Sequence, residues 1–193
     1  SGLEDFHSHI LPGVDDGVSK IEESFQILQL YESLGVRKLW LTPHIMEDIP
    51  NSTVALMDKF ENLKANYSGP IELRLAAEYM LDSLFISRLE SKDLLPLGDE
   101  KQYLLVETSF WVGSNILYEM LQQIFSSGFF PVLAHPERFG YMTEDDYDRL
   151  LSMGVKFQLN IPSLMGLYGM AAQKVADALL QKGAYSLIGS DLH

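Results

Sequence analysis

Hydrophobic residues follow two different spacings along the chain. Short apolar runs bounded by turn residues predict seven strands, over residues 3–9, 37–41, 71–77, 103–107, 131–135, 156–160 and 186–189. Segments with apolar residues at helical spacing predict helices over residues 21–34, 53–67, 83–91, 115–127, 144–153 and 169–182. The first helix has Ser19 as its predicted N-cap, with Glu22 three residues on, and is closed by Gly35. Because strands and helices alternate regularly, we expect an α/β fold with parallel strands and crossover helices.

The composition limits the kinds of protein this can be. With 193 residues, 47% of them hydrophobic and 21% charged, the chain fits one domain over residues 1–193. A net charge of -13 without a basic stripe argues against a nucleic-acid partner. The absence of cysteine excludes disulfides, thiolate zinc sites and cysteine nucleophiles. No apolar run reaches the roughly 18 residues of a membrane span and no signal pattern is present, so we expect a cytoplasmic protein without membrane insertion.

Histidines and acidic residues gather where the predicted strands end. All five histidines lie at or just past the C-terminal end of a strand, as do several acids. Eight residues share this position: His7, His9, His44, Glu78, Glu107, His135, Asp191 and His193. Asp16 belongs to the VDDG motif that follows the first predicted strand. A single isolated histidine is more often a satisfied polar residue in a loop, but the shared position of this set favours a common site. Active sites of parallel barrels lie at this end of the strands.

The residue spacing also suits metal binding. His7 and His9 are two residues apart on an extended chain, so both side chains point to one face, and Asp191 and His193 repeat the arrangement. Imidazoles and carboxylates together suit borderline or hard divalent cations. The sequence therefore predicts a multinuclear metal site.

Six motifs carry a resemblance to a known family. In chain order they are DFHSHILPGVDDG, TPHI, AAEY, LLVETSF, PVLAHPERF and IGSDLH. They resemble the motifs of the PHP superfamily, named for polymerase and histidinol phosphatase. They are most similar to those of the manganese-dependent protein-tyrosine phosphatases of bacterial capsular polysaccharide and exopolysaccharide biosynthesis loci. The resemblance implies a distorted, TIM-like (β/α)7 barrel around three metal ions. Relatives usually continue with a further arginine and a closing helix, so we expect this chain to lack its final C-terminal helix.

The resemblance also implies how the ligands are shared. One ion would take His7, His9, Glu78 and Asp191, a second would share Glu78 and add Glu107 and His135, and the third would take Asp16, His44 and His193. Alignment of the VDDG motif favours Asp16 over its neighbour Asp15. The expected cofactor is Mn²⁺, with iron or Zn²⁺ as alternatives. Four carboxylates and three divalent ions leave a pocket with about two positive charges, which suits a phosphate monoester.

The implied reaction is hydrolysis of phosphotyrosine. A water between two ions would lose its proton, and the hydroxide would attack phosphorus in line with the leaving oxygen. Arg138 matches a family arginine and would bind the phosphate oxygens. The alternative is a purely structural role, in a salt bridge within its loop. The implied substrate is a phosphotyrosine protein, in particular a bacterial tyrosine kinase that controls capsule or exopolysaccharide synthesis.

Several further residues are assigned supporting roles. Asp5 shares the face of His7 and His9, and Gln158 and Asn160 are placed to hydrogen-bond ligands. Three aromatic residues follow ligand strands and could form a rim for the phosphotyrosine ring, although core packing is as plausible for them. They are Tyr79, Phe110 and Trp111.

The sequence leaves two other kinds of function open: a different phosphoesterase of the superfamily and a non-catalytic binding module. The same metals would serve a histidinol-phosphate phosphatase or a phosphodiesterase of the superfamily. A non-catalytic PHP module that binds a partner protein would be expected to lose ligands, and this chain keeps the whole set.

Overall fold

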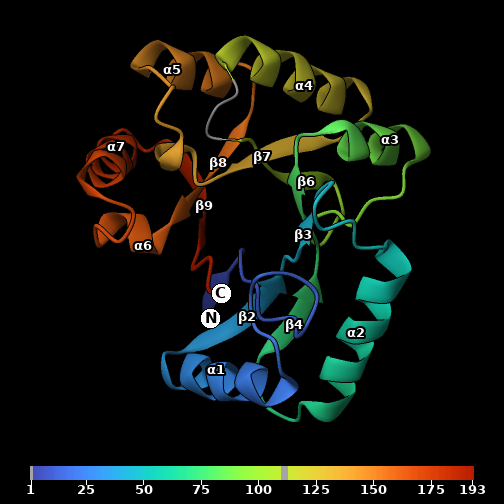
Figure 1. The fold of residues 1–193 in the computed structure, drawn as a ribbon. Helices are drawn as coiled ribbons and strands as arrows, with labels where there is room; N and C mark the ends of the chain where they lie inside the picture. Colours follow the sequence, from blue (N-terminus) through green and yellow to red (C-terminus); the bar gives the residue numbers. More distant parts are fainter. Residues whose placement is uncertain (1, 110–112) are drawn as a thin grey trace.

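Parallel strands and outer helices build the structure, a computed structural model that describes residues 2–109 and 113–193 (Figure 1). Its strands are β1 (Leu3–Asp5), β2 (Val36–Leu41), β3 (His44–Ile45), β4 (Glu72–Leu75), β5 (Glu78–Met80), β6 (Tyr103–Glu107), β7 (Phe130–Ala134), β8 (Lys156–Asn160) and β9 (Tyr185–Gly189). Its helices are α1 (Ile21–Ser33), α2 (Thr53–Asn66), α3 (Ser83–Ser91), α4 (Ser114–Ser126), the 3-10 helix η1 (Pro136–Arg138), α5 (Glu144–Ser152), α6 (Ile161–Leu164) and α7 (Met170–Gln181). Every ladder between these strands is parallel, which confirms the predicted α/β class.

The ladders form two open sheets rather than one closed barrel in the described part of the chain. One sheet has the order β1-β2-β4, and the other has the order β3-β5-β6-β7-β8-β9. The predicted second strand corresponds to β2 and is followed by the short strand β3, and the predicted third strand corresponds to β4 and is followed by the short strand β5. The ladder is interrupted between the two members of each pair. Pro43 lies in the first interruption and has no N–H to donate to a ladder. Single hydrogen bonds from Ala76 N to Leu41 O and from Glu78 N to Pro43 O continue the pairing of these two chain segments through the interruption.

Helices cover the sheets on their outer faces. Figure 1 shows α1 and α2 beside β2 and β4, and α4, α5 and α7 around β7, β8 and β9. Leucine, isoleucine, valine and aromatic side chains from strands and helices form one large buried cluster between these layers. None of the described helices is both long enough and apolar enough to cross a membrane.

The start of α1 differs from the prediction by one residue. Lys20, not Ser19, is the N-cap, and Glu23, not Glu22, folds back to the start of the helix. The Glu23 carboxylate accepts hydrogen bonds from Lys20 N at 3.1 Å and Ser19 N at 3.2 Å. The acid three residues after the N-cap therefore makes its half of a capping box, while the Lys20 side chain, which has no acceptor, makes no cap hydrogen bond in return.

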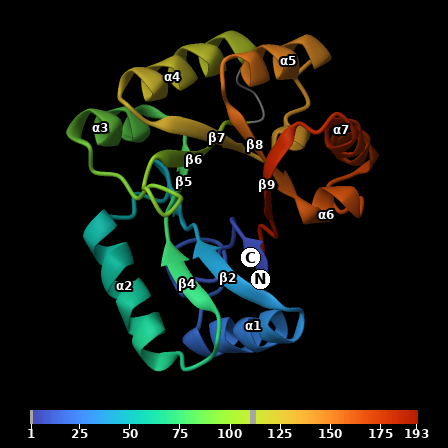
Figure 2. The same ribbon diagram turned by 180° about the vertical axis from the view of Figure 1, so that it is seen from behind.

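The two ends of the chain lie side by side, as both views of the ribbon show (Figures 1 and 2). Phe6 N donates to Ile188 O at 3.1 Å, Asp191 N to His7 O at 2.8 Å, and His9 N to Leu192 O at 2.8 Å. The histidine pair of the first strand thus meets the Asp191–His193 pair that follows the last.

Candidate metal centre

Glu78 lies at the centre of a cluster of imidazoles. Its Oε2 atom is 3.1 Å from His7 Nε2, 3.2 Å from His9 Nε2 and 3.1 Å from His44 Nδ1. Its Oε1 atom is 3.1 Å from His135 Nε2. The residue is fully buried at the start of β5. Four imidazoles from three separate segments of the chain thus converge on one carboxylate.

Predicted site residues form three groups, and within each group the ligand atoms lie within 4.8 Å of one another. The groups are His7, His9, Glu78 and Asp191; His44, Glu78 and Glu107; and His9, Asp16, His44 and His193. The first group has the predicted composition. In the second, His44 stands where His135 is predicted, and the third gains His9. His135 remains close, with Nε2 3.6 Å from Glu107 Oε2.

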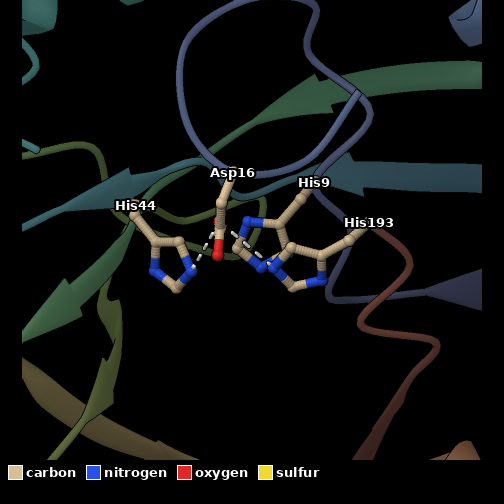
Figure 3. A group of neighbouring side chains, drawn as sticks. All are labelled: His9, Asp16, His44 and His193. Carbon is tan, nitrogen blue, oxygen red and sulfur yellow. Dashed lines mark ion pairs between the residues drawn. The ribbon is translucent and has the colours of Figure 1, made fainter. Parts of the chain in front are cut away.

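The third group gathers side chains from both ends of the chain. Figure 3 shows Asp16 between His44 and His193, with the His9 ring beside His193. Asp16 Oδ1 is 3.5 Å from His44 Nε2 and 3.4 Å from His193 Nε2. The rings of His9 and His193 stack with centroids 4.0 Å apart.

Asp15 and Asp16 have different surroundings. The Asp15 side chain is fully buried and bonds to His9 Nδ1 at 2.9 Å and to His44 N at 3.0 Å. Burial by itself raises the pKa of Asp15, but the hydrogen bonds and charge of His9 outweigh it and lower that pKa. Asp16, with 66% of its side chain exposed, reaches two histidines instead. Asp15 therefore orients the His9 ring and the backbone at His44, whereas Asp16 points its carboxylate at two of the imidazoles.

A set of polar side chains supports the ligands from behind. Gln158 Oε1 lies 2.7 Å from His7 Nδ1, and Asn160 Nδ2 donates to Asp191 Oδ2 at 2.6 Å. Asp5 Oδ1 accepts from His7 N and from Ser190 N, both at 3.0 Å. The bond to Gln158 fixes the His7 ring with Nε2 turned toward Glu78, while the other bonds hold Asp191 and the backbone on either side, as hydrogen bonds behind a metal-binding histidine do.

The charges of the cluster shift the protonation of its members. Burial disfavours the charged form of His7, but attraction to Glu78 and Asp191 outweighs it and raises the His7 pKa to about 9. Burial disfavours the charged form of His9 as well, but its close contacts with the carboxylates of Asp15, Asp191 and Glu78 raise its pKa well above the usual value. In turn, the histidines lower the pKa of Glu78, chiefly through the charge of His7, although burial acts in the opposite direction. Protons on the histidines thus hold the carboxylates and imidazoles together, a role that bound cations could also fill.

Buried atoms without hydrogen-bond partners test whether this chemistry fits metal ions. In the part of the chain that the structure describes, His44 Nδ1, Glu78 Oε2 and His135 Nδ1 are buried and make no hydrogen bond. Such atoms are costly unless paired. Two of the three belong to the groups above, where nitrogen and carboxylate oxygen lie together without thiolate. The donor set fits a borderline divalent cation such as Mn²⁺, iron or Zn²⁺.

Arg138 reaches the edge of the cluster from η1. Its Nη1 donates to Asp191 Oδ2 at 3.1 Å, and its guanidinium carbon lies 4.0 Å from the centre of the Tyr168 ring. Nothing in the sequence pattern predicts Tyr168 here, because it lies in the turn between α6 and α7 rather than at a strand end. His135 and Asp191 both have left-handed backbone conformations, with φ of 37° and 52°. Non-glycine residues in that region are often found at functional sites.

The predicted aromatic rim is not present at Tyr79. Its side chain is fully buried, its hydroxyl accepts a hydrogen bond from Leu95 N at 2.7 Å, and its ring packs on Phe85. Successive residues of a strand point to opposite faces, so Tyr79 faces the helix layer when Glu78 faces the site. Phe110 and Trp111 lie outside the described residues.

Gly17 allows the VDDG loop to lie against His9. An added Cβ would come within 2.2 Å of His9 O and 2.7 Å of His9 Cβ. We expect Gly17→Ala to push Asp15 and Asp16 away from the histidines and to lower the free energy of unfolding by about 1–3 kcal/mol. Thermal melting measures this. Gly140→Ala is the matched control, because its Cβ would meet nothing within 4 Å; equal losses in both variants would contradict the close-approach argument.

Comparisons with known proteins agree with this geometry. The family model "Capsular polysaccharide synthesis, CpsB/CapC" matches residues 3–193. The tyrosine-protein phosphatase YwqE of Bacillus subtilis is 25% identical over 98% of this chain and 76% of its own length. The tyrosine-protein phosphatase CpsB of Streptococcus pneumoniae is 29% identical, covering 98% of this chain and 82% of its own length.

A solved structure has the same fold. It comes from a study of YwqE from Bacillus subtilis and CpsB from Streptococcus pneumoniae, described there as unique metal-dependent tyrosine phosphatases. The superposition has a TM-score of 0.89 and covers 99% of this chain and 79% of the other, at 24% sequence identity.

Proposed function

Because this chain belongs to the CpsB/CapC family of capsular polysaccharide synthesis, we propose that it is a metal-dependent protein-tyrosine phosphatase. The observation that carries the proposal is the convergence of five imidazoles and four carboxylates on one end of the parallel strands. The relatives named as tyrosine-protein phosphatases support it. A non-catalytic role is disfavoured, because a binding module gains nothing from keeping the complete set of predicted ligands.

The proposed cofactor is a set of three divalent ions, with Mn²⁺ as the first choice. The nine predicted ligands would hold them; these are His7, His9, Asp16, His44, Glu78, Glu107, His135, Asp191 and His193. Glu78 is the natural bridge, since its two carboxylate oxygens face different histidines. When bound, such ions polarise a phosphoryl oxygen and lower the pKa of bound water to about 7.

The chain's own residues would bind and orient the substrate. Arg138 would hold the phosphate oxygens with its planar fork, which suits phosphate geometry better than a lysine does. Asn160 and Gln158 would keep Asp191 and His7 in place through the bonds described above. A tyrosinate leaving group has a pKa of about 10, so no strong general acid is needed for its departure.

The two sheets can be understood as parts of one distorted (β/α)7 barrel formed by a single domain over residues 1–193. Two features support this. The same two chain segments stay hydrogen-bonded on both sides of the gap between the sheets, through the bonds to Leu41 O and Pro43 O, and Ser8 pairs with Leu192 where the two chain ends meet.

The proposed substrate is a phosphotyrosine protein in the cytoplasm, in particular a bacterial tyrosine kinase of the same biosynthetic system. The family's link to capsular polysaccharide synthesis supports that partner. The net charge of -13 supports a role that does not involve nucleic acid.

A substrate panel tests the proposed function. With added Mn²⁺, we expect kcat/KM for a phosphotyrosine peptide to exceed that for phosphoserine peptide, histidinol phosphate and a phosphodiester by about a hundredfold, because the best leaving group needs the least protonation. A chelator should abolish turnover. A preference for histidinol phosphate or for the diester would replace this proposal by another activity of the PHP superfamily, and turnover that survives complete metal removal would contradict the metal centre.

A further inference from the structure

Arg138 is held from two directions. One is the hydrogen bond to Asp191 Oδ2 at 3.1 Å, and the other is the Tyr168 ring, whose centre lies 4.0 Å from the guanidinium carbon. The Arg138 side chain is 22% exposed, so both contacts lie near the mouth of the site. The first contact attaches the arginine to a predicted ligand, and the second places the face of an aromatic ring against its guanidinium group.

The turn that carries Tyr168 is built to point this side chain inward. Gly166 and Gly169 flank it with φ of 75° and 91°, a conformation that favours glycine. Leu167 N donates to Pro162 O at 3.1 Å, and Gly169 N to Gly166 O at 3.0 Å. Tyr168 is 37% exposed, whereas Leu167 is 69% exposed. The turn is therefore ordered by its own hydrogen bonds and directs the aromatic ring toward Arg138.

Stacking and hydrogen bonding use different parts of a guanidinium group. An aromatic ring attracts the cation through its face, while the N–H donors lie in the plane and point outward at the edge. A ring stacked on the face can therefore orient the donors without occupying them. An arginine attached to Asp191 alone could rotate about its long side chain, and ordering that side chain on phosphate would cost conformational entropy.

We propose that Tyr168 is a positioning residue that holds the plane of Arg138 so that its donors meet the phosphate oxygens. This inference rests on the proposed phosphatase function for its role in catalysis, but its physical core is phosphate binding by Arg138. Preorganised donors act most strongly on charge that they already face, so both phosphate affinity and turnover should depend on the ring.

The test measures binding of inorganic phosphate to the Mn²⁺-loaded protein by calorimetry, with phosphotyrosine turnover measured in parallel. We expect Tyr168→Ala and Tyr168→Leu to weaken phosphate binding and lower kcat/KM by about 5- to 30-fold, the range of a partly buried cation–aromatic contact. Tyr168→Phe keeps the ring and should restore both quantities to within about twofold of the unmodified protein. Metal content and melting temperature should stay the same. Leu167→Ala, in the same turn, is the matched control and should change neither quantity by more than about twofold.

A double-mutant cycle separates positioning from a general effect on the fold. In the Arg138→Ala background, Tyr168→Ala should produce no further loss of phosphate affinity. An equal loss with and without Arg138, or a loss that Tyr168→Phe fails to restore, would overturn the inference, as would unchanged binding in Tyr168→Ala. If the protein binds phosphate in this Tyr168-dependent way but does not hydrolyse phosphotyrosine, only the proposed function fails. If it binds no phosphate at all, the positioning role is overturned as well.

Discussion

Replacing Glu78 with glutamine should abolish phosphotyrosine hydrolysis while leaving the fold in place. The two oxygens of Glu78 face four imidazoles at 3.1 to 3.2 Å. The glutamine amide would remove the negative charge and replace one accepting oxygen by an N–H donor at the centre of the site. If the proposed centre is right, losing this carboxylate removes several kcal/mol of metal-derived stabilisation of the transition state, which corresponds to at least about a thousandfold in kcat/KM. Steady-state kinetics and metal analysis of the purified variant measure both effects.

The matched control is Glu90→Gln on the exposed face of α3, which removes the same charge far from the strand ends. It should keep activity within about twofold. Activity within tenfold of the unmodified protein in Glu78→Gln, with the usual amount of bound metal, would remove Glu78 from the proposed centre.

Local sequence patterns were sufficient to predict most of the elements. The strands β6 and β8 and the helix α3 have the predicted bounds, and most other ends differ by one or two residues. These segments are bounded by clear turn residues and have one consistent spacing. The short strands β3 and β5 could not be predicted, because they depend on where neighbouring strands stop pairing and not on their own two or three residues.

The gathering of these histidines and acids at one end of the strands was predictable, because it needs only residue type and strand polarity. His135 after β7 and Asp191 after β9 are far apart in sequence, yet both lie where parallel strands end on the same side. The grouping of the ligands was harder to predict. His9 belongs to two groups and His44 takes a place expected for His135, because distances of about an ångström decide it.

Contacts made by side-chain direction or by turns were the hardest to predict. Tyr79 faces the core because it is one residue away from Glu78 on a strand, a consequence of the pleat that the motif AAEY does not display. Tyr168 reaches Arg138 only because a glycine-flanked turn folds back from α6 onto η1. No repeating pattern marks such a turn, so long-range packing had to be seen before the contact could be inferred.

Metal and protons should compete for the same site, which gives the protein opposite pH dependences with and without metal. The His7 pKa is raised to about 9, so protonated His7 stabilises the metal-free fold fully below its unfolded pKa of about 6.5, and this contribution is lost as pH rises through about 9. A shift of this size corresponds to on the order of 3 kcal/mol. His9 and His44, whose pKa values are also raised, act in the same direction.

We therefore expect the melting temperature of chelated protein to fall between about pH 6 and pH 9, while the increase in melting temperature on adding Mn²⁺ grows over the same range, because ligands must lose their protons to bind metal. All five histidines of the chain are predicted ligands, so none elsewhere can supply the histidine contribution to this slope. His7→Gln should flatten the slope of the chelated protein, since glutamine cannot carry the proton. A chelated protein whose melting temperature is constant over this range, or a metal increment that shrinks as pH rises, would show that protons do not hold these carboxylates and imidazoles together in place of the ions.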